Sequence, residues 1–133
     1  MIPLDDYVNK FKGKLMNEFI TSNYIYGRCS AVFLYEEVTN DPNATNKTYY
    51  EKSSSKSKEF IEHNFSLMEK LDKDIQWSGD TMLNNIILST NLFLNNYSID
   101  GQENFQKNGE YIKGTYIADD IKYCNKLADS LKE

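Results

Sequence analysis

The sequence has few of the residues that metal centres and catalytic sites use most often. Its 133 residues include one histidine, His63, and two cysteines, Cys29 and Cys124, which are far apart. No CxxC pair and no cluster of cysteine and histidine occurs, which argues against a structural zinc site. A single histidine also leaves no room for a two-histidine metal site or mechanism. We therefore predict no catalytic residues, no metal ligands and no cofactor.

Long apolar runs and basic residues are scarce as well. The longest nearly apolar run, 82–94, is interrupted by asparagine, serine and threonine, whereas a membrane-spanning helix needs about 20 apolar residues. The 15 lysines and arginines oppose 20 aspartates and glutamates, so the net charge is −5. An acidic domain lacks the basic face that binds phosphate backbones. The sequence therefore predicts neither a membrane span nor a nucleic-acid partner.

Helical periodicity, by contrast, is abundant, since apolar residues recur at steps of three and four. The first such segment begins at Leu4 and runs as one long helix to the turn at 40–43, unless a kink or break near Gly27 interrupts it. A second segment begins after Asn46 or Thr48. Its first half places three serines at would-be core positions, which indicates either close helix packing or a solvent-facing surface: Ser53, Ser54 and Ser57.

Two further helical segments follow. The third ends before the turn residues 98–101, and the fourth starts at Ile112, or at Ala118 if Gly114 delays it. Amphipathic helices joined by short connections pack against their neighbours in the chain. The pattern therefore predicts an all-α fold, a single-domain four-helix up-down bundle that comprises residues 1–133.

The two cysteines lie on the apolar stripes of the first and last predicted helices, which can be neighbours in such a bundle. Three interpretations follow: a Cys29–Cys124 disulfide, two unrelated buried thiols, or one reactive thiol. We predict the disulfide, although the depths of the two residues in the bundle need not match. Because disulfides persist in oxidising compartments, the bond predicts an exported protein, periplasmic or extracellular. Without the bond, the expected location is the cytoplasm.

Two groups of titratable residues on the predicted helices could suggest chemistry. Glu59 and His63 are one helical turn apart, which is typical of an ion pair on a helix surface. Asp119 and Asp120 are adjacent in sequence, so on a helix their side chains diverge by about 100°. We interpret the first as a surface pair rather than metal ligands, and the second as a solvated helix end rather than an acid–base pair.

The high number of tyrosines is the most informative feature of the composition. Ten tyrosines and seven phenylalanines are more than the core of four helices needs, and tyrosine is enriched at protein-binding surfaces. An equally open interpretation is the codon usage of an AT-rich genome, which would also explain why Arg28 is the only arginine beside 14 lysines. The candidate partner surface consists of four tyrosines: Tyr24, Tyr35, Tyr49 and Tyr111.

A sub-pattern of aromatic, small and cysteine residues surrounds both cysteines: Tyr26-x-x-Cys29-x-Ala31-x-Phe33 and Tyr123-Cys124. It resembles small exported two-cysteine helical proteins of AT-rich marine bacteria and their phages. The resemblance implies a helical fold and export, and it assigns no activity. The layout also resembles periplasmic helical immunity proteins that inhibit cell-wall hydrolases, although no motif transfers residue by residue.

The function that these features predict is that of a non-enzymatic helical binding protein, either an exported inhibitor or a module that interacts with a protein partner. Two alternatives remain: a structural or assembly subunit that packs through its helices, and a carrier that holds a small molecule in the bundle core. The alternatives differ in what they require. An inhibitor needs a tyrosine-rich acidic patch, an assembly subunit a broad apolar face, and a carrier an enclosed cavity.

Overall fold

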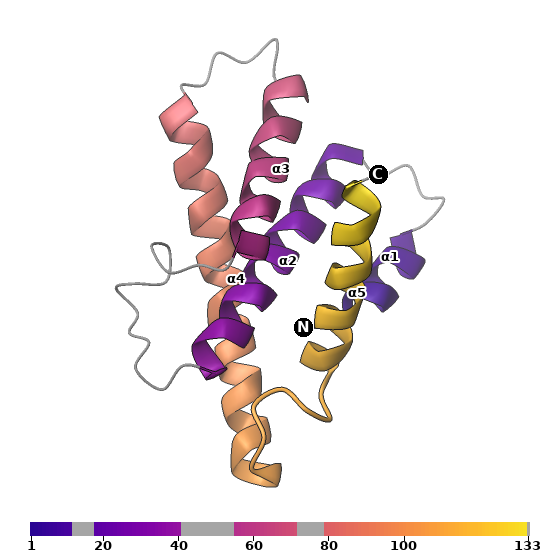
Figure 1. The fold of residues 1–133 in the computed structure, drawn as a ribbon, viewed down its shortest axis with the longest axis vertical. Helices are drawn as coiled ribbons and strands as arrows, with labels where there is room; N and C mark the ends of the chain where they lie inside the picture. Colours follow the sequence, from indigo (N-terminus) through magenta and orange to yellow (C-terminus); the bar gives the residue numbers. More distant parts are fainter. Residues whose placement is uncertain (12–17, 41–54, 72–78, 133) are drawn as a thin grey trace.

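Helices are the only regular secondary structure in the parts of the chain that the structure, a computed structural model, describes, namely residues 1–11, 18–40, 55–71 and 79–132 (Figure 1). The predicted all-α class is confirmed. None of these described helices combines the length with the apolar composition that crossing a membrane requires. The five helices are α1 (Leu4–Phe11), α2 (Glu18–Asn40), α3 (Ser55–Leu71), α4 (Gly79–Asn108) and α5 (Tyr116–Leu131).

The arrangement differs from a bundle of four equivalent helices. Helix α2 is central and packs against α3, α4 and α5, whereas α1 packs against α5. In place of the one long first helix predicted from the sequence, the structure describes two helices, α1 up to Phe11 and α2 from Glu18, and residues 12–17 lie outside the described part. The break near Gly27 that the sequence left open does not occur, because Gly27 lies within α2.

Two glycines explain how α2 and α4 pack so closely. A Cβ atom at Gly27 would lie 2.9 Å from the Phe93 ring, and a Cβ atom at Gly101 would lie 1.9 Å from the Tyr35 hydroxyl oxygen. Each helix thus inserts one aromatic ring at a glycine of the other. The sequence separation is the same in both pairs, as expected for two helices that run in the same direction, which Figure 1 also shows.

Gly101 also corrects the prediction of a turn at residues 98–101. Helix α4 continues through these residues to Asn108, because Gly101 serves as a contact point for Tyr35 and does not end the helix. The chain turns at the next glycines, Gly109 and Gly114, whose φ angles are 73° and 82°. Such left-handed backbone conformations favour glycine.

The start of α5 follows from local capping. Thr115 is the N-cap residue, and its hydroxyl oxygen accepts a hydrogen bond from the Ile117 N–H (3.1 Å). A side-chain acceptor at this position satisfies an N–H that has no partner within the helix. Helix α5 therefore begins at Tyr116, between the two starts, Ile112 and Ala118, that the sequence left open.

Small polar residues join α2 to α3. Ser57 donates a hydrogen bond to the Ser30 carbonyl oxygen (2.9 Å), and Ser30 donates one to the Ser57 carbonyl oxygen (3.1 Å). Both serines are fully buried. Of the two interpretations of the serine-rich stretch, close packing is confirmed at Ser57, whereas Ser53 and Ser54 lie outside the described residues.

The glycine at position 101 gives the first testable prediction. Replacing an interior helical glycine by alanine normally stabilises a helix by up to about 1 kcal/mol. We expect Gly101→Ala to do the opposite and to lower the free energy of unfolding by about 1–3 kcal/mol through overpacking, because the new methyl group would overlap Tyr35. Urea unfolding measures the change. In a Tyr35→Phe background the loss should be smaller, and a stabilising Gly101→Ala exchange would contradict the packing.

Candidate functional site

The only arginine of the chain is fully buried at the centre of a polar network. Arg28, on α2, forms an ion pair with Asp120 on α5, and its Nε–H donates a hydrogen bond to the Tyr97 hydroxyl (3.1 Å) on α4. Its Nη1 donates to the Ile2 carbonyl oxygen (2.6 Å) and to the Tyr24 hydroxyl (3.3 Å). One guanidinium group therefore connects α2, α4, α5 and the residues that precede α1.

Asp120 uses both carboxylate oxygens in this network. Its Oδ2 accepts from Arg28 and from the Tyr97 hydroxyl (2.7 Å), and its Oδ1 accepts from the Leu4 N–H (2.8 Å). Leu4 is the first residue of α1, so Asp120 satisfies a helix N–H that would otherwise lack a partner. The prediction that Asp119 and Asp120 form a solvated helix end is wrong for Asp120, which is fully buried, and correct in placing Asp119 at the exposed surface.

Burial and neighbouring charges shift the proton affinities of the network. Burial alone would lower the pKa of the Arg28 guanidinium, but Tyr97 and Asp120 outweigh this effect and raise it. Burial raises the pKa of the Tyr97 hydroxyl far above its ordinary value of 10.0, against the lowering effect of Arg28 and with the support of Asp120. Tyr97 therefore stays a neutral hydrogen-bond donor to Asp120.

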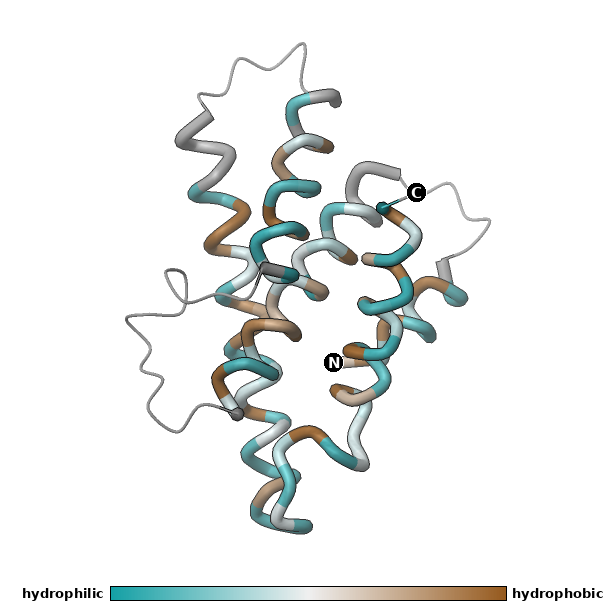
Figure 2. Tube along the Cα trace, viewed as in Figure 1, coloured by the Kyte–Doolittle hydropathy of each residue, from teal (hydrophilic) through white to brown (hydrophobic). Residues whose placement is uncertain are grey.

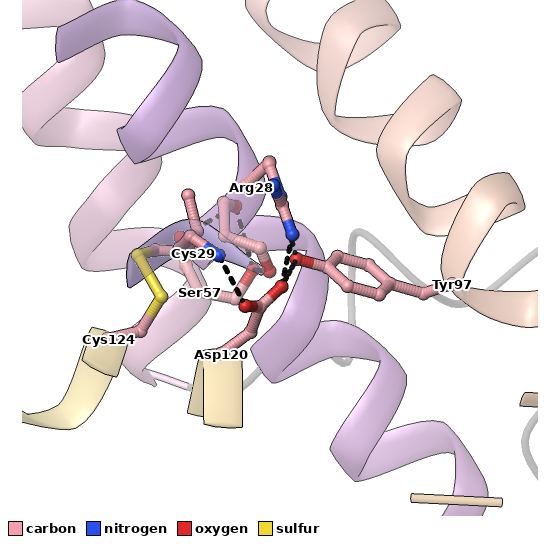
Figure 3. The surroundings of a disulfide bond; sticks show 8 residues. Arg28, Cys29, Ser57, Tyr97, Asp120 and Cys124 are labelled. Atoms are coloured by element: carbon pink, nitrogen blue, oxygen red, sulfur yellow. Dashed lines mark hydrogen bonds and ion pairs between the residues drawn. A yellow bond between two sulfur atoms is a disulfide. The ribbon is translucent and has the colours of Figure 1, made fainter. Parts of the chain in front are cut away.

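The disulfide lies beside this network (Figure 3). Cys29 and Cys124 are bonded, with a Cα–Cα distance of 5.4 Å, well within the usual range for disulfides. Cys29 follows Arg28 directly on α2, and Cys124 is one turn beyond Asp120 on α5. Because the structure describes two helices in place of the first predicted one, Cys29 lies in the middle of α2 rather than late in a longer helix, which places it level with the middle of α5.

The three described tyrosines of the predicted partner surface do not gather at one exposed place. Tyr35 is only 4% exposed, so it belongs to the core, and the prediction that it contributes to a surface is wrong. Tyr24 is partly buried, with its ring stacked on Tyr7 at 4.2 Å between centroids. Tyr111 is partly buried and stacks on Phe105 at 4.3 Å. Tyr49 lies outside the described residues.

The only histidine, His63, lies in the middle of α3. The His63 Nε2 atom is 3.8 Å from a carboxylate oxygen of Glu59, and both side chains are about one-third exposed. The pair matches the predicted helix-surface interaction. Among the residues described here, no group of three or more histidine, cysteine, aspartate or glutamate side chains is placed so that it could hold a metal ion.

A surface hollow of about 280 Å³ lies between α1 and α5. Its lining combines carboxylates and ammonium groups with two uncharged residues: Asp5, Asp6, Asp119, Lys122, Lys126, Pro3 and Tyr123. The mostly charged lining differs from the enclosed bundle cavity that the carrier alternative requires. Burial and, next, the charge of Asp5 raise the pKa of Tyr123.

Exposed apolar side chains instead gather on α4. Leu88 and Leu92 are each 59% exposed and Ile99 is 51% exposed. In the hydropathy view, hydrophobic residues recur along the length of α4 (Figure 2). These three residues and three exposed polar residues share one side of the helix, which we call the outer face of α4: Asn85, Leu88, Leu92, Asn95, Ile99 and Gln102.

The buried network and the outer face were both missed in the sequence, for different reasons. Arg28 was visible as the only arginine, and that rarity was the available signal for a special environment. Nothing local distinguished Asp120 from Asp119. The outer face was hidden because α4 is apolar on both sides, so its stripe towards α2 could not be separated from its stripe towards solvent.

Comparisons of the chain with protein-family models, with curated proteins and with solved structures found no match. The resemblance to exported two-cysteine helical proteins therefore stays an expectation.

The Cys29–Cys124 bond can be tested on the purified protein in solution. Intact-mass measurement without reduction should give a chain two hydrogen atoms lighter than the thiol form, and alkylation without reduction should modify neither cysteine. Because the bonded residues are 95 positions apart, the double variant Cys29→Ala/Cys124→Ala should lose up to about 4.7 kcal/mol of unfolding free energy. Alkylation of both cysteines in the native protein would refute the bond.

The ion pair predicts unequal effects at two adjacent aspartates. Asp120→Asn leaves the Arg28 charge buried without a counter-charge, so the free energy of unfolding should fall by about 3–5 kcal/mol. Asp119→Asn, the matched control at an exposed position, should change it little. Chemical denaturation of the two variants measures the difference. Equal stabilities would show that the buried pair does not contribute.

The raised pKa of Tyr97 predicts how the free energy of unfolding changes with pH in the alkaline range. The folded protein keeps the Tyr97 proton well above pH 10, where the unfolded chain releases it. The contribution of Tyr97 is therefore complete below about pH 10 and falls above it by about 1.4 kcal/mol per pH unit. In Tyr97→Phe, the slope of unfolding free energy against pH between 10.5 and 11.5 should be shallower by roughly that amount. Parallel slopes would contradict the buried neutral hydroxyl.

Proposed function

We propose that the chain is a non-enzymatic interaction protein that docks onto another protein surface through the outer face of α4. The observation that carries the proposal is the exposure of Leu88, Leu92 and Ile99 along one side of a single helix. Contiguous exposed apolar side chains on a folded protein mark interaction sites. Polar residues surround the three side chains, as in the rim of a protein–protein interface.

The same face distinguishes between the alternatives drawn from the sequence. An assembly subunit that packs through its helices needs an apolar helix face, which α4 presents. The inhibitor alternative relied on tyrosines, of which Tyr35 is buried and Tyr24 is turned towards Arg28. The proposed docking surface is therefore the outer face of α4 and not the tyrosine set.

The two cysteines and the histidine, which could have served in catalysis or metal binding, already have partners within the chain. The two sulfur atoms are bonded to each other, and His63 is paired with Glu59. Both cysteines are fully buried. This supports a role in binding, in which the disulfide and the buried ion pair hold α4 on a rigid support.

Export is part of the proposal. A disulfide that closes most of a small chain is typical of proteins that fold in oxidising compartments, and the Cys29–Cys124 pair has that form. In fractionated native cells, the protein should appear outside the cytoplasm with both sulfur atoms protected from alkylation. A cytoplasmic protein with two free thiols would contradict this part of the proposal.

The docking surface predicts where contacts form in native cells. A photo-reactive benzoyl-phenylalanine at position 92, on the outer face, should form protein adducts on irradiation. The same group at Ser66, which is exposed on α3, is the matched control and should form few. Denaturing electrophoresis and mass spectrometry identify the adducts. Equal yields at the two positions would refute the outer face of α4 as the docking surface.

A further inference from the structure

The outer face of α4 has the residue spacing of a coiled-coil seam. Its six residues follow one another at alternating steps of three and four along the helix: Asn85, Leu88, Leu92, Asn95, Ile99 and Gln102. Apolar residues at this 3.5-residue period let two helices pack knobs into holes. The buried residues of α4 lie on the opposite side, towards α2, and include Ile86, Leu94 and Tyr97. The seam is therefore accessible to a second helix over a length of about 26 Å.

The absence of charged side chains along this part of α4 limits which partners can bind there. Residues 81–99 contain no charged side chain, although a quarter of the whole chain (26%) is charged and its net charge is −5. Helices α1, α3 and α5 carry Lys, Asp or Glu along their lengths, and the only charged residue of α2 between Glu18 and Glu36 is the buried Arg28. Two copies of an acidic protein repel each other wherever their charged surfaces meet, and a charge-free face avoids that penalty. A partner of opposite charge would instead be recognised by a charged surface.

Resting on the proposed function of the outer face of α4, we infer that its partner is a second copy of this chain, bound through an antiparallel α4–α4 pair. A two-fold axis between Leu92 and Asn95 makes the seam complementary to itself. In this register Leu88 of one copy packs against Ile99 of the other, and Asn95 of each copy lies opposite Leu92 of the other, so that the two Asn95 side chains are diagonal neighbours across the axis. A polar residue within an apolar seam fixes the register of such a pair.

The antiparallel orientation follows from the acidic end of the seam. Asp100 and Glu103 follow the uncharged stretch, and Glu103 is exposed. A parallel pair would bring the exposed Glu103 of both copies together, whereas Asp100 is paired within its own chain with the Met1 ammonium and the Tyr116 hydroxyl. In the antiparallel register Glu103 of one copy lies near Asn84 of the other, which carries no charge. Opposed helix dipoles favour the same orientation.

Sedimentation equilibrium of the full chain tests the dimer. The native protein should sediment with about twice the 15.5 kDa chain mass, and Ile99→Glu should raise the dimer dissociation constant by about 100-fold or more, because each substitution occurs twice in a symmetric interface. Ser66→Glu adds the same charge on exposed α3 and should leave the dimer intact. Circular dichroism should show that both variants stay folded. A native protein that is monomeric at all concentrations would overturn the inference, as would dissociation by both variants alike.

Cysteine cross-linking tests the orientation. Leu88→Cys and Ile99→Cys are prepared separately, mixed and mildly oxidised. An antiparallel pair should give a disulfide-linked dimer in the mixture, containing one chain of each variant, and little from either variant alone. Links that form within each variant alone would overturn the antiparallel register.

The photo-reactive group at position 92 separates this inference from the proposed function. An adduct with twice the chain mass, containing only this sequence, supports the second copy as partner. An adduct with a different protein would overturn the inference and leave the proposed docking surface in place. Absence of adducts above the Ser66 control would overturn both.

Discussion

The buried ion pair between Arg28 and Asp120 is the interaction on which the rest of the structure depends. It joins α2 to α5, the central helix to the last one, and each partner extends the connection further. Arg28 reaches the Tyr97 hydroxyl on α4 and the Ile2 carbonyl oxygen, while Asp120 accepts the first N–H of α1. Four of the five described helices therefore meet at one guanidinium and one carboxylate.

The chemistry of the guanidinium explains why the only arginine stands at this position. A lysine ammonium is a point charge, whereas arginine presents donors in a fixed planar fork. At position 28 the Nε, Nη1 and Nη2 atoms each donate to a different group. Desolvation makes such a pair costly, and a well-packed apolar pair could be as stable. Its contribution is therefore geometric: only one relative placement of α2, α4 and α5 satisfies all its hydrogen bonds.

The helical class was readable from the sequence because apolar periodicity is a local property, and residues from each predicted stripe do lie in the core. The helix boundaries were less readable. A glycine such as Gly101 can either end a helix or leave room for an aromatic ring from a neighbouring helix, and the local sequence is the same in both cases. Only the position of Tyr35 in the folded protein shows that the second applies. The site was the least predictable part, since Asp119 and Asp120 differ only in which of them faces Arg28. The disulfide was predictable as a pairing, but its matching depth depended on α1 and α2 being two helices.

The covalent bond between Cys29 and Cys124 also determines how the protein would respond to mechanical force. Helices α3 and α4 lie entirely within the loop that the bond closes, whereas α1 lies outside it. Tension applied to the chain before Cys29 and after Cys124 would pass through the two sulfur atoms and bypass everything between them. Under such a load α1 and the other parts outside the loop would bear the tension, while the outer face of α4 would bear none and keep its shape. Reduction of the bond would release the whole enclosed segment to extend.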